Sequence, residues 1–200
     1  MLLYNSSISG NCYKVRLLLA HLGIPYEQRE LDVVDRSNRA EVLGELNPDL
    51  RVPTLVLEDG SPIAESGAIL WYFGEGSRFV PGDRYDRAKV LQWMFFEQYT
   101  HEPAIAVVRF LVAYSGEADR YASVIERKTR DGYKALDALE RHLARSDGYV
   151  VGTAMSLADI ALYAYTHVAH EGSFDLSGYP AIQSWLDRVA AEPGHVSIEA

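Results

Sequence analysis

The stretch RVPTLVLEDGSPIAES, residues 51–66, decides the fold. Its apolar and β-branched run at residues 54–57 predicts a strand, and Asp59-Gly60 is a strong signal for a hairpin turn. Residues 62–64 then predict the return strand, and Ser66 is a typical residue for the start of a helix. This part of the chain is therefore expected to form an antiparallel hairpin followed by a helix.

The chain before this stretch alternates between extended and helical patterns. Apolar residues at helical spacing from Val15 to Leu22 predict a helix that ends at Gly23. The other expected elements are strands at residues 2–4 and 26–34 and a short helix at residues 40–46. A parallel strand pair joined by a helix, followed by an antiparallel hairpin, is the order of a thioredoxin-like α/β domain, which we assign to residues 1–76.

Strand signals end after this first domain. Residues 77–84 contain Pro81 and Gly82 and are the expected linker. Apolar residues then recur at helical spacing, which predicts an all-α helical bundle over residues 85–200. The segment 157–169 is apolar on nearly every side and is expected to be a buried helix. Ser156 and Asp159 form a capping-box pattern at its start, which we interpret as structural.

Composition and charge restrict the class of protein. The 200 residues are 48% hydrophobic and 24% charged, which suits one large or two small globular domains. The formal net charge of −9 argues against nucleic-acid binding, which needs a basic face. No apolar run approaches the ~20 residues of a membrane span, and the first residues lack a signal-peptide pattern. The one cysteine, Cys12, excludes an internal disulfide, so we expect a cytoplasmic protein.

The sequence Ser9-Gly10-Asn11-Cys12 lies between the first strand and the first helix, where thioredoxin-like folds hold their reactive pair. Ser9 replaces the leading cysteine, so the chain has no dithiol of its own. The Ser9 hydroxyl and the Asn11 amide can instead donate to the sulfur of a bound thiol. Lowering a thiol pKa from ~8.5 by about two requires roughly 2.7 kcal/mol, which two donors at a helix terminus can supply. The alternative is that Ser9 only caps the helix; Cys12 is expected to be a packed side chain.

Two further motifs suit the binding of a small peptide. Pro53 directly precedes a strand and is a candidate cis proline, which would turn the N–H and C=O of Val52 outward for pairing with a peptide. A trans proline at the start of a strand is the alternative. At the next helix start, Ser66 can bind the carboxylate of an amino acid and Glu65 its ammonium group. Helix capping by Ser66 is compatible with that role.

Together these motifs resemble cytosolic glutathione transferases. The resemblance rests on Ser9 to Cys12, Asn47-Pro48, residues 51–55, Glu65 to Ile69 and residues 156–160, in the family's order and spacing. It covers essentially the whole chain. The resemblance implies a thioredoxin-like domain that binds glutathione as co-substrate, an all-helical domain that binds a second, electrophilic substrate, and a homodimer.

The resemblance also implies roles for individual residues. Val52 would pair its backbone with the cysteinyl part of glutathione, and Pro53 would be the cis proline. Glu65 and Ser66 would hold the γ-glutamyl end, and Arg51 is a candidate for the glycine carboxylate. These are the expected glutathione-binding residues.

The family divides into tyrosine, serine and cysteine types at the catalytic position. Ser9 matches the serine type, and Asn11 matches a bacterial subgroup in which serine or threonine and a nearby asparagine hold the sulfur. Tyr4 lies near the tyrosine-type position but is one residue out of register, so we expect it to be a packed strand residue. The catalytic residues implied are Ser9 and Asn11, and which of them is the main stabiliser of the thiolate stays open.

A long helix over residues 85–114 is expected to line the pocket of the second substrate. It carries the polar and aromatic residues Tyr99, His101 and Arg109, with Ile105 among them. Arg109 would stabilise negative charge that develops on the electrophile. A solvated helix face is the alternative for any one of these residues.

The predicted function is attack of a glutathione thiolate on an electrophilic small molecule. Disulfide reduction, isomerisation and cleavage of a halide or ether at the same site are alternatives. A non-catalytic interaction module with the same fold is the alternative of another class. The six histidines are scattered without other ligands at metal-binding spacing, so no metal is predicted.

Overall fold

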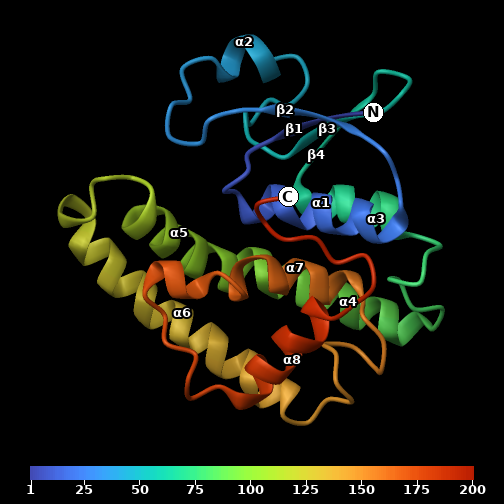
Figure 1. The fold of residues 1–200 in the computed structure, drawn as a ribbon, viewed down its shortest axis with the longest axis vertical. Coiled ribbons are helices and arrows are strands. Elements are labelled where there is room, and N and C mark those ends of the chain that lie inside the picture. The colour runs from blue at the N-terminus through green and yellow to red at the C-terminus, as the bar shows by residue number, and fades with distance from the viewer. The chain divides into compact units, whose positions relative to one another are not determined.

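The computed structural model describes residues 1–200, which form two compact units. Unit 1 comprises Met1–Ser77 together with Pro193–Ala200, and unit 2 comprises Arg78–Glu192. Figure 1 shows the sheet within unit 1 and the helices of unit 2. No helix is long and apolar enough to cross a membrane.

Unit 1 contains a four-stranded mixed sheet in the order β2-β1-β3-β4. β1 pairs with β2 in parallel, whereas β3 is antiparallel to both β1 and β4. Its elements are β1 (Leu2–Asn5), α1 (Gly10–Leu22), β2 (Glu27–Glu30), α2 (Arg39–Leu43), β3 (Thr54–Val56), β4 (Pro62–Ala64) and α3 (Ser66–Gly74). The predicted parallel pair and antiparallel hairpin are thus both present, and the thioredoxin-like fold is confirmed.

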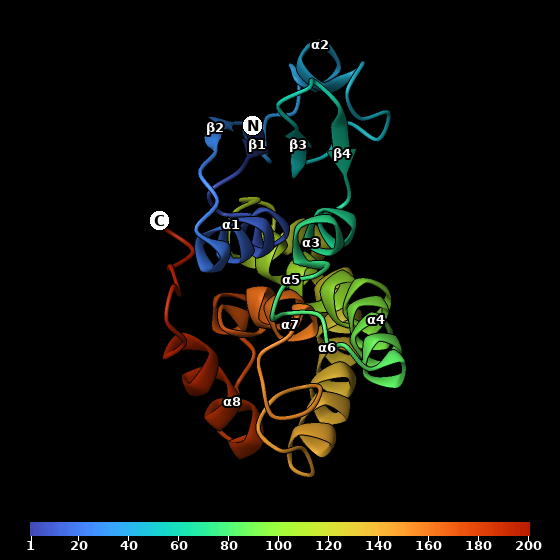
Figure 2. The same cartoon turned by 90° about the vertical axis from the view of Figure 1, so that its right-hand side faces the viewer.

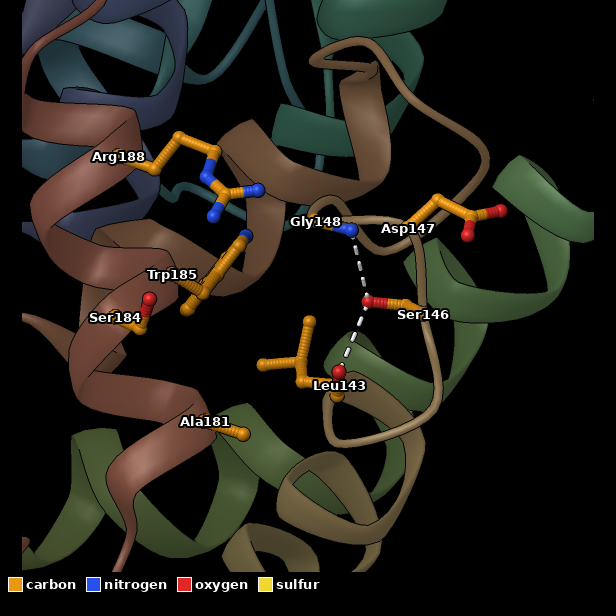
Figure 3. Close-up of a pocket in the computed structure, with 8 residues that line it drawn as sticks. All are labelled: Leu143, Ser146, Asp147, Gly148, Ala181, Ser184, Trp185 and Arg188. Carbon is orange, nitrogen blue, oxygen red and sulfur yellow. Dashed lines mark hydrogen bonds between the residues drawn. The ribbon is translucent and has the colours of Figure 1, made fainter.

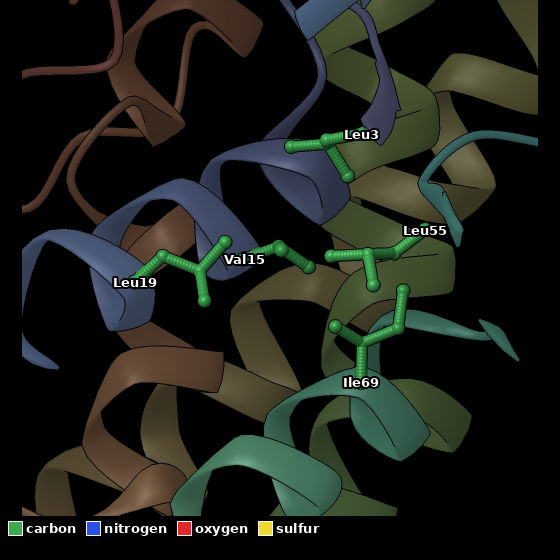
Figure 4. Close-up of a cluster of buried hydrophobic side chains, with 5 residues drawn as sticks. All are labelled: Leu3, Val15, Leu19, Leu55 and Ile69. Carbon is green, nitrogen blue, oxygen red and sulfur yellow. The ribbon is translucent and has the colours of Figure 1, made fainter. Parts of the chain in front are cut away.

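The two faces of this sheet are covered differently. Helices α1 and α3 lie side by side on one face, and α2 lies on the other (Figures 1 and 2). On the first face, β1, α1, β3 and α3 contribute a cluster of buried side chains: Leu3, Val15, Leu19, Leu55 and Ile69 (Figure 4). Since each such side chain stabilises the fold by about 1.5–3 kcal/mol when fully buried, this cluster holds α1 and α3 against the sheet.

The opposite face of β1 carries Tyr4, which packs with Leu31 and Leu43. Tyr4 is only 8% exposed, and the Arg29 guanidinium lies 5.7 Å from its ring centroid. The expectation that Tyr4 is a packed strand residue is therefore correct. The expected strand at residues 26–34 is shorter: only Glu27–Glu30 pairs, because β2 is an edge strand whose side chains are all exposed.

Unit 2 is entirely helical, as predicted. Its helices are α4 (Arg84–Phe96), α5 (Glu102–Ala113), α6 (Ala122–Leu143), α7 (Leu157–Thr166) and α8 (Pro180–Ala190), with short 3₁₀ turns at Asp119–Tyr121 and Ala169–Gly172. A π-helical turn, Glu97–His101, joins α4 to α5. The expected long helix at residues 85–114 is thus continuous, but the wide π turn shifts which residues face inward after it.

Helix α7 is buried along its whole length, as its apolar sequence indicates. Ser156 caps it, and the predicted capping box with Asp159 is present. The Asp159 carboxylate accepts hydrogen bonds from the N–H groups of Ser156 and Val150, both at 2.8 Å, and from Trp185 Nε1 at 2.9 Å. Burial raises the pKa of Asp159, and these donors oppose that change. One carboxylate thus joins α7, α8 and the preceding loop.

Two segments lie elsewhere than the sequence suggests. Phe79, in the expected linker 77–84, is fully buried in unit 2, and its carbonyl accepts a hydrogen bond from Leu157 N at 3.0 Å. Residues 193–200, expected within the helical domain, belong instead to unit 1, where side chains of α1 hold them. Neither pairing has a local sequence signal, because both join residues far apart in the chain.

Candidate active site

The start of α1 presents Ser9 at the edge of the sheet. Ser9 is the N-cap residue with extended backbone angles, and its Oγ accepts a hydrogen bond from Cys12 N at 3.3 Å. Its own N–H donates to Ser6 O at 3.0 Å, which fixes the loop that leads into the helix. Ser9 is half-buried. The capping role is thus real, and it leaves the hydroxyl hydrogen available as a donor because Oγ is an acceptor in the cap.

Asn11 lies in the first turn of α1 and contacts the start of α3. Its Oδ1 accepts hydrogen bonds from Lys14 Nζ at 2.7 Å and from Ser66 Oγ at 3.3 Å. Lys14 and Ser66 are 1% and 4% exposed. Two predicted site residues that are 55 positions apart are therefore in direct contact. Because the side-chain oxygen is the acceptor in both bonds, the amide nitrogen of Asn11 is the group that can donate to a ligand.

The residue before α3 has an unusual backbone conformation. Glu65 is exposed and has φ = 68°, a value that side-chain-bearing residues rarely adopt. Its side chain makes no capping hydrogen bond to α3. An observed backbone outlier at a helix start indicates a position held for a purpose other than local stability. Glu65 and Ser66 thus present a carboxylate and a hydroxyl at one helix terminus.

The loop before β3 is held by a buried asparagine. Asn47 Nδ2 donates to Arg51 O at 3.1 Å and to Thr54 Oγ1 at 3.0 Å, and Asn47 is 4% exposed. Within this loop the Val52–Pro53 peptide is cis, as predicted. The N–H and C=O of Val52 make no hydrogen bond within the protein. Val52 is the position where a peptide ligand can pair with the main chain.

Ser9 and Val52 both line an open cleft of ≈ 280 Å³. Its remaining lining residues are Val33, Arg36, Arg39 and Arg51. Arg39 is 3% exposed, and its Nη2 donates to Asp32 O at 2.6 Å, while its buried Nε has no partner. Burial and the neighbouring charge of Arg36 lower the pKa of Arg39. Three guanidinium groups at one cleft make it a site for an anionic group.

The arginines of this cleft differ in whether a carboxylate of the protein already binds them. Arg51 forms an ion pair with Asp49 at 2.6 Å, but both side chains are more than half exposed, so that pair is a weak one. Arg51 was predicted from the sequence, whereas Arg36, Arg39, Lys14 and the loop-holding role of Asn47 were not. Only Asn47, in the Asn47-Pro48 pair, carried a sequence signal.

Cys12 is a buried thiol beside this site. It is 0% exposed, and its sulfur accepts a hydrogen bond from Ser6 N at 3.3 Å. Burial raises the pKa of Cys12 to about 11, an effect that the bond with Ser9 only partly offsets. The thiol is therefore protonated at neutral pH and packed, as expected, and does not act as a nucleophile.

The residues expected to line a second-substrate pocket are not gathered on one surface. Tyr99 is 88% exposed, whereas His101 and Ile105 are 0% exposed and lie in the core of unit 2. His101 Nε2 contacts Thr166 Oγ1 at 2.9 Å. Arg109 is 4% exposed and is paired with Glu171 at 3.0 Å. Tyr99 and His101 lie within the π turn, and Ile105 and Arg109 follow it. The expected face was predicted for a regular α-helix, without the change of register that the π turn introduces.

Another pocket lies in unit 2, between α8 and the loop that follows α6 (Figure 3). Its volume is ≈ 340 Å³, and it contains none of the residues predicted to carry chemistry. Gly148 N donates to Ser146 Oγ at 3.3 Å, and Arg188 extends over Gly148, where a Cβ would lie 1.7 Å from Nη1. The one cationic side chain that lines this pocket, Arg188, is exposed. The cleft beside Ser9 is the better candidate, because the predicted residues Ser9, Arg51 and Val52 line it.

Taken together, the sheet order, the helix start at Ser9 and the all-helical second unit define a thioredoxin-like domain joined to a helical domain. Two family models match the chain: "Glutathione S-transferase, N-terminal domain" over residues 8–75 and "Glutathione S-transferase, C-terminal domain" over residues 104–193. The chain belongs to the glutathione S-transferase family. The sequence-based prediction of a glutathione-dependent transferase is confirmed at that level.

Known proteins resemble the chain over nearly its whole length. A crystal structure of a glutathione S-transferase from Pseudomonas fluorescens Pf-5 is 47% identical with a TM-score of 0.96, covering 100% of this chain and 98% of that one. The disulfide-bond oxidoreductase YfcG of Escherichia coli K12 is 26% identical, over 92% of this chain and 87% of its own length. Ure2p in complex with S-hexylglutathione is 25% identical, with a TM-score of 0.86, over 96% and 95% of the two chains.

Proposed function

We propose that unit 1 binds glutathione across the starts of α1 and α3 and that Ser9 and Asn11 stabilise its thiolate. The observation that carries the proposal is the contact between Ser66 Oγ and Asn11 Oδ1 at 3.3 Å. It places a residue expected to bind the ligand beside one expected to bind its sulfur. The S-hexylglutathione complex of Ure2p supports glutathione as the ligand of this fold.

The γ-glutamyl end of glutathione would lie at the start of α3. Ser66 and the N–H groups of the first helical turn bind its carboxylate, where the helix dipole favours negative charge. The exposed carboxylate of Glu65 binds its ammonium group. The positive φ of Glu65 keeps both groups at the same terminus.

The cysteinyl and glycyl parts would continue toward the cleft beside Ser9. Val52 N–H and C=O pair with the cysteinyl main chain, since they make no bond within the protein. The glycine carboxylate then meets the cleft that contains Arg36, Arg39 and Arg51. Of these, Arg39 is the best placed, because it is buried and its Nε has no partner.

The thiolate of bound glutathione is the nucleophile in this proposal. The Ser9 hydroxyl and the Asn11 amide donate to it, and the start of α1 adds its positive dipole end. Together they lower the thiol pKa by about two, equivalent to roughly 2.7 kcal/mol. The thiolate forms a bond to an electrophilic carbon and displaces the leaving group, a reaction that suits detoxification of electrophiles.

Disulfide reduction is the second candidate, and the Asn11 position favours it. The chain resembles a disulfide-bond oxidoreductase, and its own thiol, Cys12, is buried and protonated. The glutathione thiolate would therefore attack the substrate disulfide itself, forming a mixed disulfide and releasing a thiolate. A second glutathione would then release the remaining thiol and form glutathione disulfide.

We further propose a cytoplasmic homodimer. The outer side of α4 and the π turn exposes the large side chains Tyr85, Phe95 and Tyr99. Phe95 and Tyr99 are one turn apart, and exposed aromatic residues are enriched in protein–protein interfaces. Cys12 is a free thiol and the chain forms no disulfide, which suits a reducing compartment.

Calorimetric titration with glutathione, beside assays with an aromatic halide and with a glutathione-linked disulfide, tests the proposal. We expect binding, and the better substrate separates the two candidate reactions. Ser9→Ala should lower kcat about 10- to 100-fold with little change in glutathione affinity. Unchanged activity in Ser9→Ala, with a large loss in Asn11→Ala, would show that Asn11 and not Ser9 stabilises the thiolate. Absence of glutathione binding would leave an interaction module.

A further inference from the structure

The segment 193–200 lies in unit 1, where side chains of α1 hold its main chain. Tyr13 Oη donates to Val196 O at 2.7 Å, and His21 Nδ1 donates to Pro193 O at 2.9 Å. Arg16 Nη2 donates to the carbonyl of Ile198, whose side chain is buried. The three carbonyl acceptors are spread along the segment, so it is held as a whole.

Arg16 also holds the loop that carries Ser9. Its Nη1 donates to Asn5 Oδ1 at 2.7 Å and to Ser6 O at 3.3 Å, and its Nη2 donates to Ser7 O at 3.2 Å. Ser6 O in turn accepts the N–H of Ser9 at 3.0 Å. One guanidinium group therefore connects the segment 193–200 to the residues directly before Ser9.

The connection is rigid because Arg16 is buried. It is 2% exposed, and its charge is met by side-chain and main-chain oxygens rather than by a carboxylate. The one carboxylate of the network, Glu30, binds Asn5 Nδ2 at 2.7 Å and the N–H of Ser7. Removing a hydrogen-bond acceptor from a buried cation lowers the stability of the folded protein strongly. Without Ile198 O, the guanidinium would turn toward water and release the loop.

We infer that Arg16 is a positioning residue through which the segment 193–200 holds Ser9 in place for the glutathione thiolate. The inference rests on the proposed function of Ser9. Arg16 does not touch the ligand: it acts through Asn5, Ser6 and Ser7. Loss of the segment should therefore weaken the stabilisation of the thiolate more than the binding of glutathione, because Ser66, Val52 and Arg39 lie outside this network.

The test compares the full chain with a variant in which residues 193–200 are deleted. The ultraviolet absorbance of the bound thiolate is followed against pH, with kcat and glutathione affinity measured in parallel. Since a hydrogen bond to a charged group changes an equilibrium by about tenfold, we expect an approximately tenfold smaller thiolate fraction near neutral pH. A similar fall in kcat should accompany it, with affinity changed less than about threefold.

Two further variants and a rescue distinguish positioning from general loss of structure. Arg16→Met should reproduce the deletion, and combining both should add little. Tyr13→Phe removes the contacts of Tyr13 Oη with Val196 O and His195 Nε2, retains Arg16, and should give a smaller change in the same direction. The synthetic peptide Pro-Gly-His-Val-Ser-Ile-Glu-Ala, added to the deletion variant, should restore the thiolate fraction.

An unchanged thiol pKa and kcat in the deletion variant and in Tyr13→Phe would overturn the inference, whatever their thermal stability. A full chain that binds glutathione without lowering its thiol pKa would instead overturn the proposed role of Ser9. The two failures are therefore separable within one set of measurements.

Discussion

The side chains at the starts of α1 and α3 serve the fold and the proposed site at the same time. Ser9 caps α1 through its Oγ, and Ser66 is the first residue of α3. A hydroxyl that accepts a capping bond still has a hydrogen to donate. Ser9 can therefore cap α1 and bind the ligand at the same time. Whether it also binds the ligand is decided by measuring activity after the hydroxyl is removed.

At this scale we predict that Cys12 is inert. Because burial raises its pKa to about 11, iodoacetamide at pH 7.5 should leave it unmodified in the folded chain and modify it after denaturation. Cys12→Ala should keep kcat/KM within about twofold and cost about 1 kcal/mol of stability. Rapid modification of the native protein, measured by mass spectrometry, would show that the thiol is accessible.

Single elements are fixed by a few buried polar groups as much as by apolar packing. Helix α7 is fully buried, so the donors before it have no access to water, and Asp159 satisfies them. In unit 1 the segment 193–200 has no regular structure of its own and depends on side chains of α1. In both places the acceptor and donor come from different parts of the chain.

For α7 we predict that Asp159→Ala destabilises unit 2 by about 3 kcal/mol or more, because several buried donors lose their acceptor. Urea unfolding followed by far-ultraviolet circular dichroism measures the change. Asp187→Ala, at an exposed position on α8, is the matched control and should stay within about 0.5 kcal/mol of the parent. Equal stability of the two variants would contradict the role of Asp159 as the acceptor for these buried donors.

For the segment 193–200 we predict a pH dependence set by His195. Burial and the nearby charge of His21 lower the pKa of His195, whose Nε2 lies 3.2 Å from Tyr13 Oη. The unfolded chain then binds more protons, so stability is fully present above pH ~6.5 and is lost as pH falls through the folded pKa. Unfolding free energies measured between pH 7.5 and 5 should fall less steeply for His195→Gln. Equal slopes of unfolding free energy against pH in the parent and in His195→Gln would contradict the role of His195.

At the scale of the whole molecule, the proposed homodimer would form through unit 2. The exposed aromatic residues of α4 and the π turn are its most evident unpartnered apolar feature. Tyr99 also lines a cleft of ≈ 260 Å³ with residues of α5 and α6, among them Lys128 and Lys134. Asp131 also lines this cleft and pairs with Lys134 at 3.0 Å, so an interface there would bury the Tyr99 ring beside a mixed, charged rim.

We predict that Phe95→Glu, alone or with Tyr99→Glu, converts a homodimer into a monomer. A buried unpaired carboxylate strongly opposes association, and both positions are largely exposed in the single chain. Light scattering coupled to size exclusion should show half the mass of the parent. Arg145→Glu, an exposed change outside α4, should leave the mass unchanged; a parent that is already monomeric would refute the dimer.

The sequence by itself determined the fold class and the places in the chain of the motifs proposed to bind glutathione. The hairpin at residues 54–64, the helix end at Gly23 and the capping box at Asp159 depend on turn and cap chemistry within a few residues. Such short-range preferences can be read from the chain directly. Pro53, directly before a strand, was a candidate cis proline, and the family resemblance implied the cis peptide that the structure has.

Only the tertiary structure decided which side chains meet and which are buried. The contact of Asn11 with Ser66 joins two helix starts, and the bond of Arg16 to Ile198 spans most of the chain. Arg39 belongs to the candidate cleft because folding buries its guanidinium beside Ser9, and His101 lies in the core because its position in the π turn faces inward. Burial and long-range pairing depend on how all elements pack together, and no local pattern encodes them.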